Sequence, residues 1–137
     1  MDKIRNLLSR FPGWLFTVLT ILIILWLTLM PDPLGEDAPS LFPGADKLVH
    51  AVMFGFLTTM IMLDRQRRDN WRELGGNFII ASALVSTLFG ILIEVLQLEM
   101  DMGRGFEVAD MVADAVGSFL CALGWKMFQG HWCKKSS

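Results

Sequence analysis

Apolar residues occur along the chain in four blocks, separated from one another by charged residues or by proline and glycine. The blocks cover residues 14–30, 48–63, 78–98 and 108–128. Each block is close to the length of about 20 residues that a helix needs to cross the hydrocarbon layer of a membrane. The pattern predicts an all-α integral membrane protein: a bundle of four transmembrane helices in a single domain over residues 1–137.

Composition supports a membrane protein, because 53% of the residues are hydrophobic and the mean hydropathy is +0.48. The first block could also be the apolar region of a signal peptide, since Lys3, Arg5 and Arg10 precede it. It is long for such a region, however, and no A-x-A-like cleavage site follows Met30. We therefore expect the first block to be retained as a membrane span.

Positive charges predict the orientation of the helices. Ten of the twelve lysines and arginines lie in the N-terminal segment, in the loop after the second block, or at the C-terminal end: Lys3, Arg5, Arg10, Arg65, Arg67, Arg68, Arg72, Lys126, Lys134 and Lys135. Only Lys47 and Arg104 lie in the segments on the other side. Because cytoplasmic loops are enriched in lysine and arginine, both termini are predicted to be cytoplasmic. We interpret the basic loop as a determinant of membrane topology and not as a nucleic-acid site, so we expect no nucleic-acid partner.

Polar residues near the ends of three blocks gather on one side once this topology is applied. The second, third and fourth predicted helices share an outer end, and the polar residues near that end are Asp46, Lys47, His50, Glu94, Gln97, Arg104, Asp110 and Asp114. A helix rises about 5.4 Å per turn, which places His50, Glu94 and Asp114 at similar depth. Spacings of three or four residues within each helix also place its polar residues on one face.

Ionisable groups inside a membrane span cost a few kcal/mol and normally face the interior of a bundle or a wet cavity. This cost favours a functional site at the shared outer end. A purely structural interpretation stays open, in which the same residues are hydrated near the interface, cap helix ends or pair with Arg104. In the fourth block, Ala113, Gly117 and Cys121 recur every four residues, a pattern typical of closely packed membrane helices.

Three motifs carry a resemblance to a known family. Asp46-Lys-Leu-Val-His50, with Phe54 and Leu57 after it, is similar to D-K-x-x-H-x-x-x-[YF]-x-x-L. Glu94-Val-Leu-Gln97 is similar to E-x-x-Q, and Arg104-Gly-Phe-Glu107-Val-Ala-Asp110, with Asp114 and Gly117, is similar to R-x-x-[DE]-x-x-D-x-x-x-N-x-x-G. Over residues 11–128 the chain resembles the VanZ-like family, whose namesake is associated with low-level resistance to teicoplanin. Asp114 departs from the asparagine that is frequent in the family, and Cys121 from a glycine.

The resemblance implies a protein of the bacterial cytoplasmic membrane that acts at the outer leaflet, where lipid-linked cell-wall precursors are exposed. Its expected partners are membrane lipids, among them a polyprenyl-linked cell-wall precursor. On this interpretation Lys47, His50, Gln97 and Arg104 contact the polar head of such a lipid. Arginine offers a planar pair of donors for phosphate or carboxylate. The carboxylates of Glu94, Asp110 and Asp114 would then orient these donors.

An enzyme is the alternative from another class, with His50, Glu94, Asp110 and Asp114 as candidate catalytic residues for acid/base or metal-assisted hydrolysis. Proton-linked transport through the same carboxylates is a third interpretation. One histidine with three carboxylates suits Mg²⁺, Mn²⁺ or Ca²⁺ better than structural Zn²⁺. The sequence assigns no metal and no cofactor, and it favours a binding role over catalysis.

Overall fold

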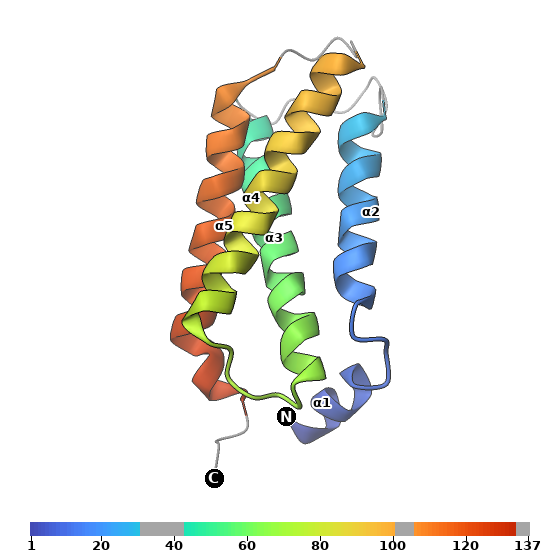
Figure 1. The fold of residues 1–137 in the computed structure, drawn as a ribbon, viewed down its shortest axis with the longest axis vertical. Helices are drawn as coiled ribbons and strands as arrows, with labels where there is room; N and C mark the ends of the chain where they lie inside the picture. The colour runs from blue at the N-terminus through green and yellow to red at the C-terminus, as the bar shows by residue number, and fades with distance from the viewer. Residues whose placement is uncertain (31–42, 101–105, 134–137) are drawn as a thin grey trace.

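The structure, a computed structural model, describes residues 1–30, 43–100 and 106–133, and these residues form helices joined by short connections. The elements are α1 (Asp2–Leu8), α2 (Leu15–Leu29), α3 (Ala45–Arg68), α4 (Gly76–Glu99), α5 (Val108–Phe128) and a 3₁₀ turn (Gln129–His131). Figure 1 shows α2 to α5 side by side, with α1 across the lower end and the C-terminal end of α5 at that same end.

Three helices, α3, α4 and α5, are long and apolar enough to cross a membrane. α2 has 15 residues and rises about 22 Å, which is shorter than a typical span. Large apolar side chains such as Val52, Leu88 and Leu120 are more than half exposed along the spans. Such a surface suits lipid, so the prediction of an all-helical membrane protein is confirmed in this coarser form.

α3 is longer than the block at 48–63 that predicted it. It begins at Ala45, after Gly44 in a left-handed conformation (φ 84°), and it ends at Arg68. At its C-terminal end Asp64 and Arg67 form an ion pair within the helix, with 2.7 Å between Oδ1 and Nη1. Three arginines that hydropathy placed in the following loop therefore lie in the last turns of α3: Arg65, Arg67 and Arg68.

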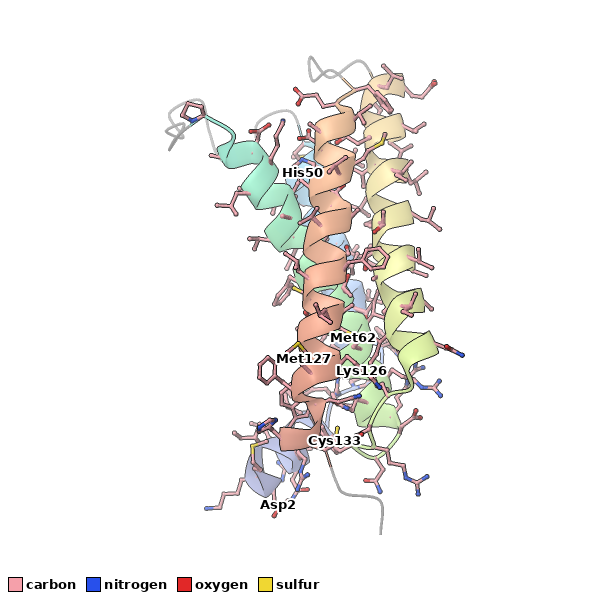
Figure 2. All side chains as sticks on the ribbon, turned by 90° about the vertical axis from the view of Figure 1, so that its left-hand side faces the viewer. Asp2, His50, Met62, Lys126, Met127 and Cys133 are labelled. Carbon is pink, nitrogen blue, oxygen red and sulfur yellow. The ribbon has the colours of Figure 1, made fainter. Side chains whose placement is uncertain are left out.

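The apolar core consists of two clusters along the length of the bundle. Ile24, Phe54, Leu57 and Ile93 join α2, α3 and α4. The second cluster lies nearer the lower end, where Figure 2 labels Met62, and its buried members are Met62, Leu74, Ile79, Ala83 and Ala122. The first cluster reaches the polar region of α3, since the ring of Phe54 stacks on His50 with 6.3 Å between centroids.

α3 and α5 make the closest helix contact in the bundle. A Cβ atom on Gly117 would lie 1.9 Å from the carbonyl oxygen of Ala51, and one on Gly55 would lie 2.9 Å from the carbonyl oxygen of Gly117. The absence of side chains at these two positions lets the backbones touch, as expected for small residues in membrane helices. Ala51 follows His50 and Gly117 lies one turn after Asp114, so this contact positions both polar residues.

A polar network centred on Arg67 joins the N-terminal segment to α3. Besides Asp64, the guanidinium of Arg67 donates to the carbonyl oxygens of Leu8 (3.0 Å) and Phe11 (2.7 Å). Asp64 in turn accepts a hydrogen bond of 2.8 Å from the main-chain nitrogen of Thr17. Arg67 is buried, so it has a structural role in addition to the contribution to topology that the sequence predicted.

Candidate functional site

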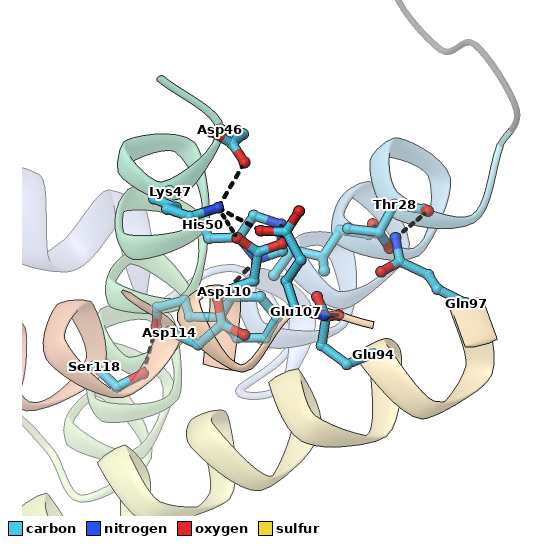
Figure 3. A network of polar contacts seen from close by, with 12 residues as sticks. Thr28, Asp46, Lys47, His50, Glu94, Gln97, Glu107, Asp110, Asp114 and Ser118 are labelled. Atoms are coloured by element: carbon cyan, nitrogen blue, oxygen red, sulfur yellow. Dashed lines mark hydrogen bonds and ion pairs between the residues drawn. The ribbon is translucent and has the colours of Figure 1, made fainter. Parts of the chain in front are cut away.

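The first turns of α3 and α5 meet the last turns of α4 at the upper end of the bundle in Figure 1. Their polar side chains form one group, which Figure 3 shows from close by. We call it the helix-end cluster; its members are Asp46, Lys47, His50, Glu94, Glu107, Asp110 and Asp114. His50, Glu94, Asp110 and Asp114 are buried, whereas Asp46 and Glu107 form an exposed rim.

Lys47 lies at this rim and is surrounded by carboxylates. Its Nζ is 3.0 Å from Asp46 Oδ2, 2.6 Å from Glu107 Oε2 and 3.0 Å from Asp110 Oδ1. An ammonium group has three protons to donate, and here each has a carboxylate partner. The charge of Lys47 is thus neutralised within the cluster, and an anionic ligand would have to displace a carboxylate to reach it.

His50 is held by Asp114 from α5. Its Nδ1 is 3.0 Å from Asp114 Oδ1, and its Nε2 is 3.8 Å from Asp110 Oδ2, which is too long for a hydrogen bond. An ionised Asp114 can only accept, so Nδ1 donates this bond, and in the neutral ring Nε2 keeps a lone pair. The open nitrogen of His50 therefore faces the side of the cluster that contains Asp110.

Two buried carboxylate oxygens have no hydrogen-bond partner among the described residues: Glu94 Oε1 and Asp114 Oδ2. The other oxygen of Glu94 accepts a long bond of 3.3 Å from the main-chain nitrogen of Glu107. Asp114 Oδ2 lies against Gly90, where a Cβ atom would come within 2.3 Å of it. Leaving such groups unpaired costs free energy, so we expect each oxygen to bind a ligand, a proton or water.

Gln97 is buried beside the cluster but turned to another helix. Its Nε2 donates a hydrogen bond of 2.8 Å to the carbonyl oxygen of Thr28, near the end of α2, as Figure 3 shows. The structure thus brings six of the eight residues selected from the sequence into the helix-end cluster, and Gln97 ties α4 to α2 next to it. Arg104 lies outside the described residues.

Glu107 belongs to the cluster although it was not selected as a site residue from the sequence. It precedes the apolar block at 108–128 and resembles a loop residue, which explains the omission. The sequence did contain a signal for it. The third family motif has an acidic residue three positions before Asp110, and Glu107, thirteen residues after Glu94, occupies that position.

The helix-end cluster has a marked excess of negative groups. Its five carboxyl groups, those of Asp46, Glu94, Glu107, Asp110 and Asp114, face two basic side chains, Lys47 and His50. Carboxylates at such short distances repel one another unless a cation or a proton lies among them. The described residues of the helix-end cluster are therefore suited to hold a cation or to move a proton.

Comparison with known proteins identifies one family. A family model described as VanZ/LLP1 matches residues 4–129, a range that contains every residue of the helix-end cluster and of the Arg67 network. No curated protein matches the chain. No solved structure matches it either.

Proposed function

The chain belongs to the VanZ/LLP1 family, and from this premise we propose that it is a four-span protein of the bacterial cytoplasmic membrane with both termini cytoplasmic. Its helix-end cluster would then lie at the outer leaflet and bind the polar head of a lipid-linked cell-envelope component. The observation that carries the proposal is the gathering of buried ionisable groups from three helices of spanning length at one end, beneath an exposed polar rim.

Packing supports α2 as the fourth span. It lies alongside α3 and α4 in Figure 1, and its Ile24 is buried against Phe54, Leu57 and Ile93. The hydrogen bond from Gln97 to Thr28 joins the ends of α4 and α2 at the level of the helix-end cluster. A helix held in the bundle along its whole length shares the apolar layer of its neighbours, even when it is shorter than they are.

Orientation can be tested with single cysteines and a maleimide that does not cross membranes. With Cys121 and Cys133 changed to serine, Phe106→Cys and Glu73→Cys place exposed thiols at opposite ends of the bundle. In intact cells we expect labelling at 106 and at least tenfold less at 73, and in permeabilised cells labelling at both. Labelling at 73 in intact cells would reverse the proposed orientation.

The charge of the site constrains the head group. Because Lys47 is already paired and the described cluster is acidic, a bare phosphate is disfavoured. A head group that offers amino groups, or one that reaches the site together with a cation, is favoured. Arg104, the arginine of the third family motif, is the residue we assign to an anionic part of the ligand.

Native mass spectrometry of the gently solubilised protein tests lipid binding. We expect the wild type to retain a lipid mass and Arg104→Ala to lose at least 90% of it, while Arg72→Ala, an exposed arginine at the opposite end, retains it. Bare protein in all three samples, or equal retention in all three, would refute the proposal. Cells that express the wild type, and not Arg104→Ala, should also show reduced teicoplanin susceptibility if the family's link to resistance applies to this chain.

A hydrolase is the second candidate, favoured by the contact between His50 and Asp114. A histidine oriented by a carboxylate through Nδ1, with Nε2 open beside further carboxylates, is the arrangement of a general base that activates water. The same mass spectra separate the two functions. An enzyme would convert the retained lipid with time, and Glu94→Gln would keep the lipid intact, whereas a binding protein would leave the lipid unchanged in both.

A further inference from the structure

Three helices each contribute one metal-ligating side chain to a single point in the helix-end cluster. His50 of α3, Glu94 of α4 and Asp110 of α5 offer ligand atoms that all lie within 4.8 Å of one another. The three residues are buried, with exposed fractions of 7%, 1% and 9%. Ligand bonds of about 2.0–2.2 Å to a central ion would draw such atoms together with only small side-chain movements.

Glu94 gives an independent indication of a ligand. It is almost fully buried, its Oε1 has no partner among the described residues, and its side chain points from α4 toward the other two helices in Figure 3. A carboxylate in this position needs a positive partner or a proton. Among the described cations, Lys47 is already bound at the rim by Asp46, Glu107 and Asp110.

Asp114 completes the arrangement as a positioning residue. By accepting from Nδ1 of His50 it fixes the ring with Nε2 toward Asp110. A metal-bound histidine in proteins almost always donates its other ring nitrogen to a carboxylate, a carbonyl or water, which fixes its tautomer and raises its basicity. The contact between His50 and Asp114 has this form.

A second acidic group, formed by Asp46, Glu107 and Asp110, is a weaker candidate. Its ligand atoms are also close together, but two of its members are exposed and Lys47 Nζ already lies among all three. The ammonium group supplies there the positive charge that an ion would supply. In the buried group Lys47 pairs with Asp110 alone, through Oδ1, while Oδ2 of Asp110 lies toward Nε2 of His50.

From these contacts we infer that His50, Glu94 and Asp110 bind one divalent transition-metal ion, with Asp114 orienting His50. The sequence suggested Mg²⁺, Mn²⁺ or Ca²⁺ for one histidine with three carboxylates, but Asp114 is bound to His50 and only two carboxylates are left as ligands. One imidazole nitrogen with two carboxylates favours Mn²⁺ or Zn²⁺ over Mg²⁺ and Ca²⁺, which prefer oxygen ligands alone. Two carboxylates neutralise the charge of the ion, and its remaining positions are free for water or a ligand oxygen. The inference goes beyond the proposed function, because it requires no lipid.

Metal titration of the purified full chain in detergent tests the inference. After treatment with EDTA and removal of the chelator, Mn²⁺ and Zn²⁺ are titrated separately by calorimetry, and bound metal is counted by elemental analysis. We expect one ion per chain in the wild type and at least a tenfold loss of affinity in Glu94→Gln. Glu99→Gln, an exposed carboxylate on the same helix, is the matched control and should bind as the wild type does. Asp114→Asn should weaken binding about 10- to 100-fold without removing a ligand.

A measurement on the wild type keeps the test decisive if the variants misfold. Electron spin echo spectra of bound Mn²⁺ should show nitrogen coupling from one imidazole, unchanged in His131→Ala, since the chain has two histidines and His131 is exposed at the opposite end. Wild type that binds no stoichiometric metal, bound Mn²⁺ without nitrogen coupling, or full affinity in folded Glu94→Gln would overturn the inference. Lipid retention is a separate measurement, so the two proposals can fail independently.

Discussion

Gly117→Ala is expected to disrupt the packing of α3 against α5 and strongly destabilise the bundle, whereas Gly124→Ala, seven residues later in α5, should leave it intact. The new Cβ at 117 would lie 1.9, 2.6 and 2.7 Å from the O, C and Cα atoms of Ala51. These are backbone atoms, so no side chain can move aside, and α3 and α5 must separate. At 124 the added Cβ meets no atom within 4 Å.

The two substitutions are expected to change the free energy of unfolding in opposite directions. Overpacking typically costs about 1–3 kcal/mol, and a clash with backbone belongs at or above the upper end of that range. Alanine is a better helix former than glycine by up to about 1 kcal/mol, which is too little to offset the clash at 117 but should slightly stabilise the protein at 124. Thermal unfolding in detergent and size-exclusion profiles of the two variants measure the difference.

The variant at 117 also tests how the polar site is positioned. Separating α3 from α5 moves His50 away from Asp114, so metal affinity should fall together with stability in Gly117→Ala and remain in Gly124→Ala. Equal melting temperatures of the two variants would show that α3 and α5 do not touch at Ala51.

The spans were predictable because lipid imposes a long apolar run on each of them. The block at 108–128 coincides with α5, and the block at 78–98 differs from α4 by three residues in all. Hydropathy failed at the C-terminal end of α3, since Asp64 to Arg68 are polar and are held by an ion pair and by contacts with the segment before α2, neither of which hydropathy detects. α1 has seven residues and lacks an apolar run long enough to be recognised.

The grouping of polar residues followed from topology and helical spacing, which bring three helix ends to one side. What the sequence could not show is the partner of each side chain. Gln97 shares a face with Glu94, yet it bonds to Thr28, because the last carbonyl groups of α2 have no partner within their own helix. The role of Arg104 remains a prediction, since it lies outside the described residues.

Arg67→Met should strongly destabilise the protein, and Arg65→Met should not. Both variants remove one positive charge from the same end of α3, so any effect on membrane orientation is matched. Arg67 and Asp64 are buried, whereas Arg65 pairs with Asp69 at the surface, with side-chain exposures of 45% and 39%. Removing one partner of a buried pair costs about 3–5 kcal/mol, and an exposed pair contributes about 1 kcal/mol or less.

The double variant Asp64→Asn, Arg67→Met separates the charge of Asp64 from the other contacts of Arg67. If the cost comes from a buried carboxylate without its partner, removing that charge should restore part of the lost stability. If it comes instead from the carbonyl oxygens of Leu8 and Phe11 that lose their donor, the double variant should be no more stable than Arg67→Met. Melting temperatures of the four proteins in one detergent distinguish these cases. An Arg67→Met protein as stable as Arg65→Met would show that the buried contacts of Arg67 stabilise the protein no more than the exposed pair of Arg65 does.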